Sequence, residues 1–430
     1  MSSGLYRRPM AACLSLSLLF AACGPGAVDA AFGGGTVALE PGSVEVAVLG
    51  VAGGGVVATG RSDRLLTNID VSGRVHNDWG AAHAAALVSG ITLSKVPTGI
   101  LAAGRDSTGY ARLIHVPDDG TRAWGFVGGS AVVSPSPVNG FGAVPLTSGQ
   151  ILALAGVVTT PETALTPKID VLRFTSSGEL VATTRYDVAV GDPPGGSFDV
   201  TVASVVATAR GTVAAVGWSW KNGDLPAPGV SARMSYLYRF RDDGTLDPTW
   251  GGASQGGPGT LPLGGSIAGA IVTWTVANRV AALPDGRVAA IGLMDALVPI
   301  DDVDPTAQRV DRYYFLRIFE ADGSPALAFH GTGVKIWPAS VANEAFEPTT
   351  LISNASGTRL FVAGLRGEGK AGVVASFDVG SSELDTTFGY RGYAAVPGVP
   401  SSLARDVTSA RLYVASQQGG RAQVTRLVID

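Results

Sequence analysis

The decapeptide Leu283-Pro-Asp-Gly-Arg-Val-Ala-Ala-Ile-Gly292 joins a turn to a short apolar strand that ends in glycine. Pro-Asp-Gly is typical of a tight turn, because proline fixes φ and glycine accepts a positive φ. Seven copies of this pattern, each ending in Gly or Ser, stop at residues 60, 104, 156, 217, 292, 364 and 416. Their spacings of 44 to 75 residues leave room for about four strands in each unit, which is the size of a propeller blade.

A second apolar strand follows most copies and alternates around an arginine or another polar residue. It occurs at residues 110–115, 171–174, 236–240, 315–319 and 424–428. Apolar residues with a period of two, bounded by Asp-Gly turns, predict antiparallel hairpins. We therefore expect an all-β protein, a seven-bladed β-propeller of four-stranded antiparallel blades.

A third signature closes several units, as in Leu246-Asp-Pro-Thr-Trp-Gly251 and Leu384-Asp-Thr-Thr-Phe-Gly389. Together with the Pro-Asp-Gly strand it resembles the delta-60 repeat family, whose units pair an Asp-Gly-x-Leu-Asp-x-x-Phe-Gly-x-x-Gly turn with such a strand. The segments 283–292 and 381–392 match well, and the first three units match poorly. The motif is structural, so the resemblance implies a fold and no chemistry.

The last unit lacks its fourth strand at the carboxyl end, because the chain stops at Asp430 directly after a third-strand pattern. Residues 32–40 begin with Phe32-Gly-Gly-Gly, which is similar to the segment that starts at Phe388 and follows the third strand of the preceding unit. We predict that residues 32–40 form the outer strand of the last blade. The propeller would then span residues 32–430, and its ring would have no exposed edge.

The amino terminus has the layout of an export signal. A basic region with Arg7 and Arg8 precedes an apolar stretch, residues 11–20, that is too short to span a bilayer as a helix. The residues Ala21-Ala22-Cys23 then resemble the lipobox of bacterial lipoproteins, although Phe20 replaces the usual leucine. An ordinary cleaved signal followed by an incidental cysteine is the alternative.

The lipobox resemblance implies that residues 1–22 are a signal peptide and that Cys23 carries a thioether lipid and an acyl chain such as palmitate on its amino group. Residues 23–31 would then tether the propeller to a membrane. Gly24, rather than Asp, after the cysteine resembles the pattern of lipoproteins sorted to the outer membrane of Gram-negative bacteria. We expect a protein of the cell envelope.

Composition excludes several kinds of site and partner. Cys13 and Cys23 are the two cysteines. Since the first leaves with the signal and the second carries lipid, we expect no disulfide and no cysteine metal site. Removing Arg7 and Arg8 leaves 29 of the 31 basic residues against 35 acidic ones, a balance that argues against nucleic acid as a partner.

No residue pattern in the chain points to a catalytic or cofactor site. The four histidines have no metal-ligand spacing, and no nucleophile elbow, phosphate loop or dinucleotide fingerprint is present. The acidic stretch at Asp301, Asp302 and Asp304 could coordinate calcium, but it lacks the glycine and terminal glutamate of an EF-hand loop. We interpret it as a solvated loop and expect no cofactor and no metal.

Three consecutive units carry extra residues between their second and third strands, at 157–168, 218–233 and 293–311. In a propeller these loops emerge on one face, and insertions in repeat folds often carry function. Exposed tryptophan beside charge is a common binding anchor, although the tryptophans could instead pack under their own loop. The candidate binding residues on this face are Trp218, Trp220, Lys221, Asp224, Asp301, Asp302 and Asp304.

We therefore predict a lipid-anchored envelope propeller that acts as a binding or scaffold module for a protein, a glycan or the cell wall. The alternative is a glycan-active or other hydrolytic or lyase enzyme with acidic residues at the mouth of the central channel. Carboxylates about 5 to 10 Å apart in one pocket would favour the enzyme. A mouth lined by Ala, Gly, Ser and Thr would favour the scaffold.

Overall fold

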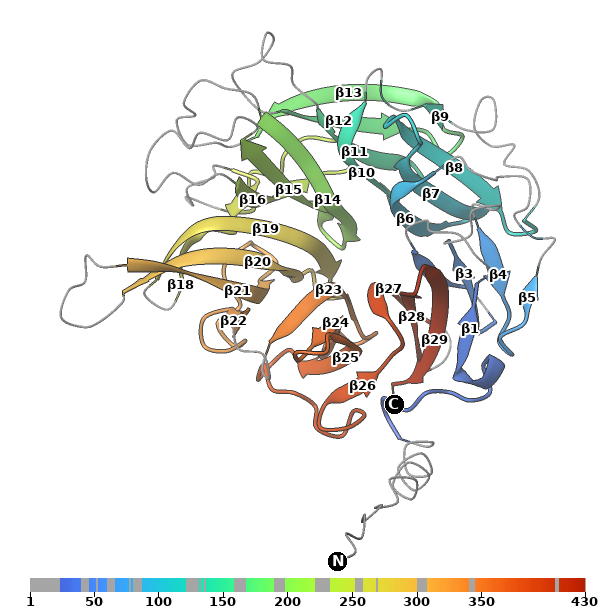
Figure 1. Ribbon diagram of the computed structural model, residues 1–430. Coiled ribbons are helices and arrows are strands. Elements are labelled where there is room, and N and C mark those ends of the chain that lie inside the picture. The colour runs from blue at the N-terminus through green and yellow to red at the C-terminus, as the bar shows by residue number, and fades with distance from the viewer. Residues whose placement is uncertain are drawn as a thin grey trace, which may run out of the picture.

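A computed structural model of the chain shows a closed ring of β-sheets around a central channel (Figure 1). The structure describes residues 24–39, 46–51, 53–59, 66–76, 79, 87–120, 131–132, 134, 137–157, 168–188, 198–220, 233–251, 258–267, 270–299, 308–339, 345–406 and 410–429. Among these residues, no helix is long and apolar enough to cross a membrane.

Each of the first four blades is a four-stranded sheet made from consecutive strands. Blade 1 contains β2 (Val48–Val51), β3 (Gly55–Ala58), β4 (Thr67–Ile69) and β5 (Val75–His76). Blade 2 contains β6 (Ser89–Val96), β7 (Gly99–Arg105), β8 (Ala111–Pro117) and β9 (Ala131–Val132). Blade 3 contains β10 (Val138–Pro145), β11 (Ile151–Val157), β12 (Lys168–Phe174) and β13 (Leu180–Asp187). Blade 4 contains β14 (Phe198–Thr208), β15 (Gly211–Trp220), β16 (Arg233–Phe240) and β17 (Thr260–Pro262).

The last three blades complete the ring. Blade 5 contains β18 (Gly265–Ile267), β19 (Ala270–Ala282), β20 (Val288–Pro299), β21 (Gln308–Phe319) and β22 (Val334–Pro338). Blade 6 contains β23 (Phe346–Ser353), β24 (Arg359–Arg366), β25 (Ala371–Asp378) and β26 (Tyr393–Ala395). Blade 7 contains β27 (Val399–Arg405), β28 (Arg411–Gln418), β29 (Arg421–Val428) and β1 (Thr36–Ala38), which follows the short turn η1 (Gly33–Gly35). The prediction of seven antiparallel blades is confirmed.

Blade 5 departs from the predicted four strands. Its central strands β19, β20 and β21 are 13, 12 and 12 residues long and extend beyond the ring (Figure 1). The short strand β18 pairs with the start of β19 and covers the edge that this extension would expose. Most of the residues predicted as an insertion at 293–311 are therefore strand, since β20 continues to Pro299 and β21 begins at Gln308.

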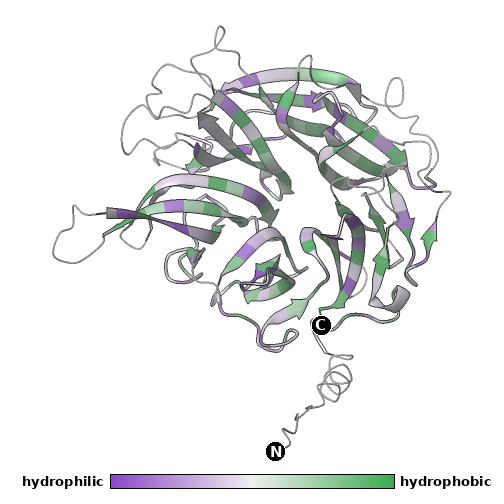
Figure 2. Ribbon diagram, viewed as in Figure 1, coloured by the Kyte–Doolittle hydropathy of each residue, from purple (hydrophilic) through white to green (hydrophobic). Residues whose placement is uncertain are grey.

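The core consists of seven clusters of buried apolar side chains, one between each pair of adjacent blades. Hydrophobic stretches accordingly recur in the strands around the whole ring (Figure 2). Each blade buries both of its faces. This explains why the repeated apolar strand, which is the second strand of its blade, is a continuous apolar run. The strand β7, for example, is buried at six of its seven positions.

The amino-terminal strand closes the ring, as predicted. In the antiparallel pair of β1 and β29, Thr36, Val37 and Ala38 lie opposite Thr425, Val424 and Gln423. The hydroxyl oxygens of Thr36 and Thr425 are 2.9 Å apart and share a hydrogen bond. This pairing covers the outer edge of the last blade, which the carboxyl end of the chain leaves without a partner.

The chain also contacts the ring before residue 32. The amide of Gly26 donates to the carbonyl of Val428 at 2.6 Å, and the amide of Gly389 in blade 6 donates to the carbonyl of Pro25 at 2.6 Å. A Cβ atom on Gly26 would lie 2.3 Å from the nitrogen of Gly389, so only glycine fits there. The segment predicted as a tether is thus bound along the rim of blades 6 and 7.

Residues 28–33 reproduce the third signature of the repeat. The Asp29 carboxylate accepts a hydrogen bond from Arg411 at 2.6 Å and lies 3.1 Å from the Arg426 guanidinium. Arg426 also stacks on the ring of Phe32 at 4.8 Å and donates to the carbonyl of Val71 in blade 1 at 2.6 Å. The two ends of the chain therefore build this unit of the last blade together and join it to the first.

Blade 4 contains the same arrangement within one continuous segment. Arg239 donates to the Asp247 carboxylate at 2.8 Å, lies 5.2 Å from the ring centre of Trp250 and donates to the carbonyl of Ala321 in blade 5. The side chains of Arg239 and Asp247 are 3% and 8% exposed. Buried charges need such pairing. In blades 4 and 7 the arginine of the third strand also donates a hydrogen bond to the next blade, which links the two blades.

Six blades share a β-bulge in their innermost strand. The register shifts between Ser89 and Thr92, Val138 and Phe141, Val202 and Ser204, Ala277 and Arg279, Pro348 and Thr350, and Pro400 and Ser402. In each blade the bulge lies opposite the end of the repeated apolar strand. The bulge places one additional residue at the channel wall and re-aims the strand.

In blades 3, 5 and 6 the bulged strand requires the glycine that ends the repeated strand. A Cβ on Gly292 would lie 2.0 Å from the carbonyl oxygen of Val276, and one on Gly364 would lie 2.2 Å from that of Glu347. A Cβ on Gly156 would lie 2.5 Å from the Asn139 carbonyl oxygen. These are backbone atoms that cannot move without breaking the sheet, so any side chain is excluded.

We predict that Gly292→Ala destabilises the protein by about 1 to 3 kcal/mol, because the new methyl group overlaps the Val276 carbonyl. The matched control is Gly217→Ala in blade 4, where the nearest atom to the new methyl group is the Ser235 hydroxyl oxygen at 3.2 Å rather than a backbone carbonyl. The control is expected to change stability by less than about 1 kcal/mol. Denaturant unfolding monitored by tryptophan fluorescence measures both. Equal losses for the two variants would contradict the proposed role of the bulge.

Acid is expected to destabilise the fold between about pH 4 and pH 2. Burial raises the pKa of Asp106, but hydrogen bonds from Thr108 and Arg112 outweigh it and lower the pKa to about 2. Burial also raises the pKa values of Asp29 and Asp247, but hydrogen bonds outweigh it and lower both, from Arg411 to Asp29 and from Thr249 and Arg239 to Asp247. A lowered carboxyl pKa stabilises the fold above its unfolded value, and this contribution is lost as the pH falls through the folded value.

Thermal unfolding at a series of pH values measures this loss. The midpoint is expected to be constant near pH 6 and to fall steadily below pH 4, and Asp106→Asn should reduce the dependence. A midpoint that is unchanged down to about pH 2 would show that these carboxylates do not stabilise the folded state.

Candidate functional site

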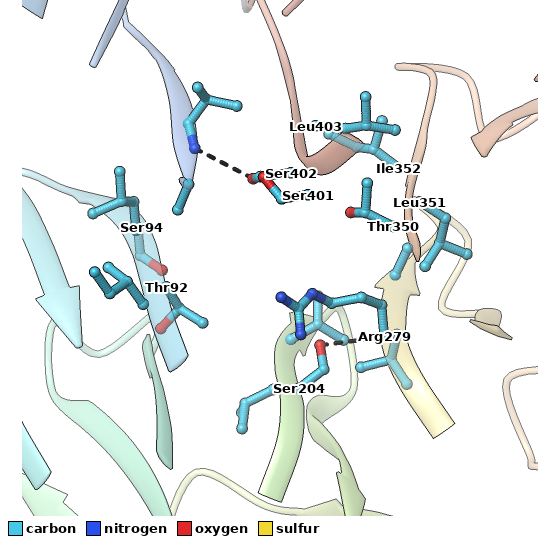
Figure 3. A pocket seen from close by; sticks show the side chains of 18 of the residues that line it. Thr92, Ser94, Ser204, Arg279, Thr350, Leu351, Ile352, Ser401, Ser402 and Leu403 are labelled. Atoms are coloured by element: carbon cyan, nitrogen blue, oxygen red, sulfur yellow. Dashed lines mark hydrogen bonds between the residues drawn. The ribbon is translucent and has the colours of Figure 1, made fainter. Parts of the chain in front are cut away.

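The innermost strands of all seven blades surround the central channel. Its inner part is a cavity of about 290 Å³ lined by the middle of the innermost strands of all seven blades. Figure 3 shows short hydroxyl side chains, Thr92, Ser94, Ser204, Thr350 and Ser402, around this space. Valine, leucine and alanine form most of the remaining wall.

Hydroxyl groups on the innermost strands hold neighbouring blades at fixed distances. Ser401 donates to the carbonyl of Val46 at 2.7 Å, which links blade 7 to blade 1. Thr349 donates to the carbonyl of Pro400 at 2.7 Å, which links blade 6 to blade 7. Both residues are the additional residues of their bulges. The bulge therefore directs a hydroxyl side chain at the adjacent blade.

A larger cavity of about 600 Å³ lies where the innermost strands begin, and we call it the channel mouth. Blades 2 to 7 line it with their bulged residues and the positions beside them. Its polar side chains are Ser89, Arg105, Asn139, Thr201, Asn278, Arg279, Thr349 and Ser401. None of the described residues that line the mouth or the inner cavity is Asp or Glu.

Arg279 is held at the centre of the mouth by the bulge of β19. Its Nη1 donates to the carbonyl of Ala203 in blade 4 at 3.1 Å and to that of Asn278 at 3.2 Å. Figure 3 shows the guanidinium reaching from the wall of blade 5 into the open space. Because two carbonyls orient it, the charge has a fixed position.

Arg105 approaches the mouth from the end of β7 and bridges blades 2 and 3. Its Nη1 donates to the carbonyl of Val138 at 3.3 Å. Its Nε atom is buried and has no hydrogen-bond partner within the part of the chain that the structure describes. On the bulge of blade 3, Asn139 donates to the Asp199 carboxylate at 2.7 Å, which fixes the orientation of its amide group.

The mouth and the predicted insertions share one face of the propeller. The start of β6 at Ser89 pairs with the end of β7 at Arg105, where the second strand turns toward the third. In the same way Trp220 at the end of β15 pairs with Phe198 at the start of β14. Connections between second and third strands therefore leave the ring beside the mouth.

Of the predicted binding residues, the structure describes Trp218 and the backbone of Trp220. Trp218 is 8% exposed, pairs with Val200 and Met234 within the sheet and packs with Tyr236 in the core between blades 3 and 4. The backbone of Trp220 ends β15, and its side chain lies outside the description. The remaining predicted residues, Lys221, Asp224, Asp301, Asp302 and Asp304, lie outside the described residues.

Histidine and acidic residues form no metal site within the described parts of the chain, where no three of the side chains that bind metals gather. His76 contacts Asp70 at 3.2 Å, and His115 contacts the Thr98 hydroxyl within blade 2. His330 in blade 5 contacts the Ser382 hydroxyl in blade 6. His83 is not among the described residues.

Comparison with known proteins supports the fold alone. No protein-family model and no curated protein matches the chain. The plexin A4 extracellular region, domains 1 to 8, is 12% identical with a TM-score of 0.54, over 92% of this chain and 51% of that chain. The Cps50 (Swd1) propeller domain of Myceliophteria thermophila is 14% identical, with a TM-score of 0.44 over 90% and 98% of the two chains.

BamB from Moraxella catarrhalis is 15% identical, with a TM-score of 0.41 over 91% of this chain and 98% of that chain. Identities this low indicate shared architecture and carry no ligand or activity from one protein to the other. The resemblances to delta-60 repeats and to bacterial lipoproteins stay predictions from the sequence. The chain is a seven-bladed β-propeller.

Proposed function

We propose that the protein is a lipid-anchored propeller of the cell envelope that binds a partner at its channel mouth. The observation that carries the proposal is the composition of the mouth, where Arg105 and Arg279 stand among neutral hydrogen-bonding side chains. Ligand sites are typically concave, of about 300 to 1,000 Å³, with a few fixed polar groups. The closed ring holds these groups on strands of different blades, so the site needs no rearrangement to bind.

The position of the amino terminus supports membrane anchoring that leaves the mouth accessible. Gly24, the residue after Cys23, begins the described chain, and Pro25 and Gly26 are bound at the rim of blades 6 and 7. Figure 1 shows both ends of the described chain at this rim, outside the channel. A lipid on Cys23 would hold the propeller by its edge at the membrane, which we propose to be the outer membrane of a Gram-negative bacterium.

The partner is proposed to be an envelope protein or a glycan. Charged and aromatic residues predicted beside the mouth could extend the contact surface, namely Trp220, Lys221, Asp224, Asp301, Asp302 and Asp304. The enzyme alternative requires two carboxylates in one pocket. The described lining of the channel carries no carboxylate, which favours binding over glycan hydrolysis.

Replacing the lipidated cysteine is expected to release the protein from the membrane. With Cys23→Ser the protein should move from the detergent phase to the aqueous phase in Triton X-114 partition, because stable anchoring requires the lipid. The control is Cys13→Ser, which changes the other cysteine of the chain, within the signal peptide. Detergent partition that persists in Cys23→Ser would refute lipidation at this residue.

Filling the mouth is expected to abolish partner capture. The full chain in detergent should retain a component of envelope extract, and Asn278→Trp, which places an indole at the mouth, should lose it. Tyr390→Trp adds the same group at the rim, where Tyr390 is 74% exposed, and should retain the component. Identical capture by both variants, or no capture by the unmodified chain, would contradict a binding role for the mouth.

A further inference from the structure

We propose that the channel mouth binds the carboxylate of an acidic sugar, with Arg279 and Arg105 as the anion-binding residues. The inference rests on the proposed binding function and names the ligand class for the same site. It follows from three features of the mouth: the sign of its charge, the orientation of its guanidinium groups and the neutral polar side chains around them.

Charge is the first argument. The whole chain has 35 acidic and 31 basic residues, yet the charged side chains among the described lining of the mouth are both arginines. A cleft with low-dielectric walls and charge of one sign concentrates the opposite ion. An acidic protein therefore presents a local positive potential where the channel opens.

The geometry of the guanidinium groups is the second argument. Each guanidinium carries five N–H donors in a planar fork that matches a carboxylate. The carbonyls of Ala203 and Asn278 orient Arg279, and the carbonyl of Val138 orients Arg105.

The neutral lining is the third argument, because it selects among anions. Ser89, Asn139, Thr201, Asn278 and Thr349 present hydroxyl and amide groups around the two arginines. Such groups both donate hydrogen bonds to the hydroxyls of a sugar and accept them, whereas a fully ionised inorganic anion can only accept them. A volume of about 600 Å³ accommodates more than one sugar ring.

Aromatic residues do not contribute to the described lining of the mouth. Stacking on an aromatic ring is therefore not the means of recognition there, and a neutral sugar would gain only hydrogen bonds that water also offers. A carboxylate adds charge-assisted hydrogen bonds, which are about twice as strong as neutral ones. The uronic acid units of an acidic glycan combine the carboxylate and the hydroxyls that this lining fits.

Isothermal titration of the full chain in detergent with tri-galacturonate tests the inference, and maltotriose serves as the neutral probe. Tri-galacturonate is expected to bind at least about tenfold more tightly than maltotriose, and its affinity should fall as salt rises from about 0.05 to about 0.5 M. Equal affinities for the two trisaccharides, or no binding of tri-galacturonate, would overturn it.

Variants test the assignment to the two arginines. Arg279→Gln and Arg105→Gln should each weaken tri-galacturonate binding by at least about tenfold. Arg405→Gln is the matched control, since Arg405 is on the innermost strand of blade 7 but outside the lining of the mouth, and its affinity should be unchanged. Thermal midpoints verify that each variant is folded. An unchanged affinity in both Arg279→Gln and Arg105→Gln would overturn the assignment.

Monomeric galacturonate distinguishes the two sources of this chemistry. Tighter binding of the trisaccharide assigns the mouth to a glycan chain, and equal binding of the monomer assigns it to the free acid. The inference also fails separately from the proposed function. If the unmodified chain captures an envelope component that Asn278→Trp loses, but binds no uronide, the binding role of the mouth stands and the acidic sugar is refuted.

Discussion

The close approach of one carbonyl to one glycine determines the geometry of the channel. In blades 5 and 6 the carbonyl oxygens of Val276 and Glu347 come within 2.0 and 2.2 Å of the position that a Cβ on Gly292 and Gly364 would take. In these two blades the bulged strand takes the space that a side chain on the glycine would need. The bulge directs an additional residue at the adjacent blade or into the mouth, so the hydroxyl links between blades and the position of Arg279 depend on it.

The last blade contains the same arrangement of an aspartate, an aromatic residue and an arginine as blade 4, but these residues come from the two ends of the chain. Asp29 and Phe32 meet Arg426 as Asp247 and Trp250 meet Arg239. In a ring, the final blade must bind the first, and a unit split between the termini makes this contact a condition of folding. It also places the residues next to Cys23 at the rim, so an anchor there would not obstruct the channel.

Positive charge at the mouth stands out because the rest of the chain is acidic. Guanidinium groups near the axis of a closed ring are costly to bury without partners. The structure meets this cost partly with backbone carbonyls, which accept hydrogen bonds from Arg279 and Arg105 and orient them. A guanidinium group held in a fixed orientation at a cavity is suited to binding an anion.

The sequence by itself determined the number of blades, the antiparallel hairpins and the closing strand. The recurrence of the apolar strand gives the number of blades, and the turns and the alternation within each unit give the hairpins. The unit that lacks its fourth strand at the carboxyl end gives the closing strand. The pattern Val28-Asp29-Ala-Ala-Phe32-Gly33 was also readable as the third signature and would have moved the start of the propeller before residue 32. Only the tertiary structure decided that Trp218 packs in the core, since the adjacent blade that covers it is built by residues of blade 3 far from it in the sequence.

The channel mouth was likewise decided by tertiary structure alone. Arg105, Asn139 and Arg279 have no shared spacing or motif. Asn139 and Arg279 reach the mouth at bulges of the innermost strands of blades 3 and 5, and Arg105 reaches it from the end of the second strand of blade 2. A register shift depends on the fit between neighbouring strands and blades, which no single stretch of residues encodes.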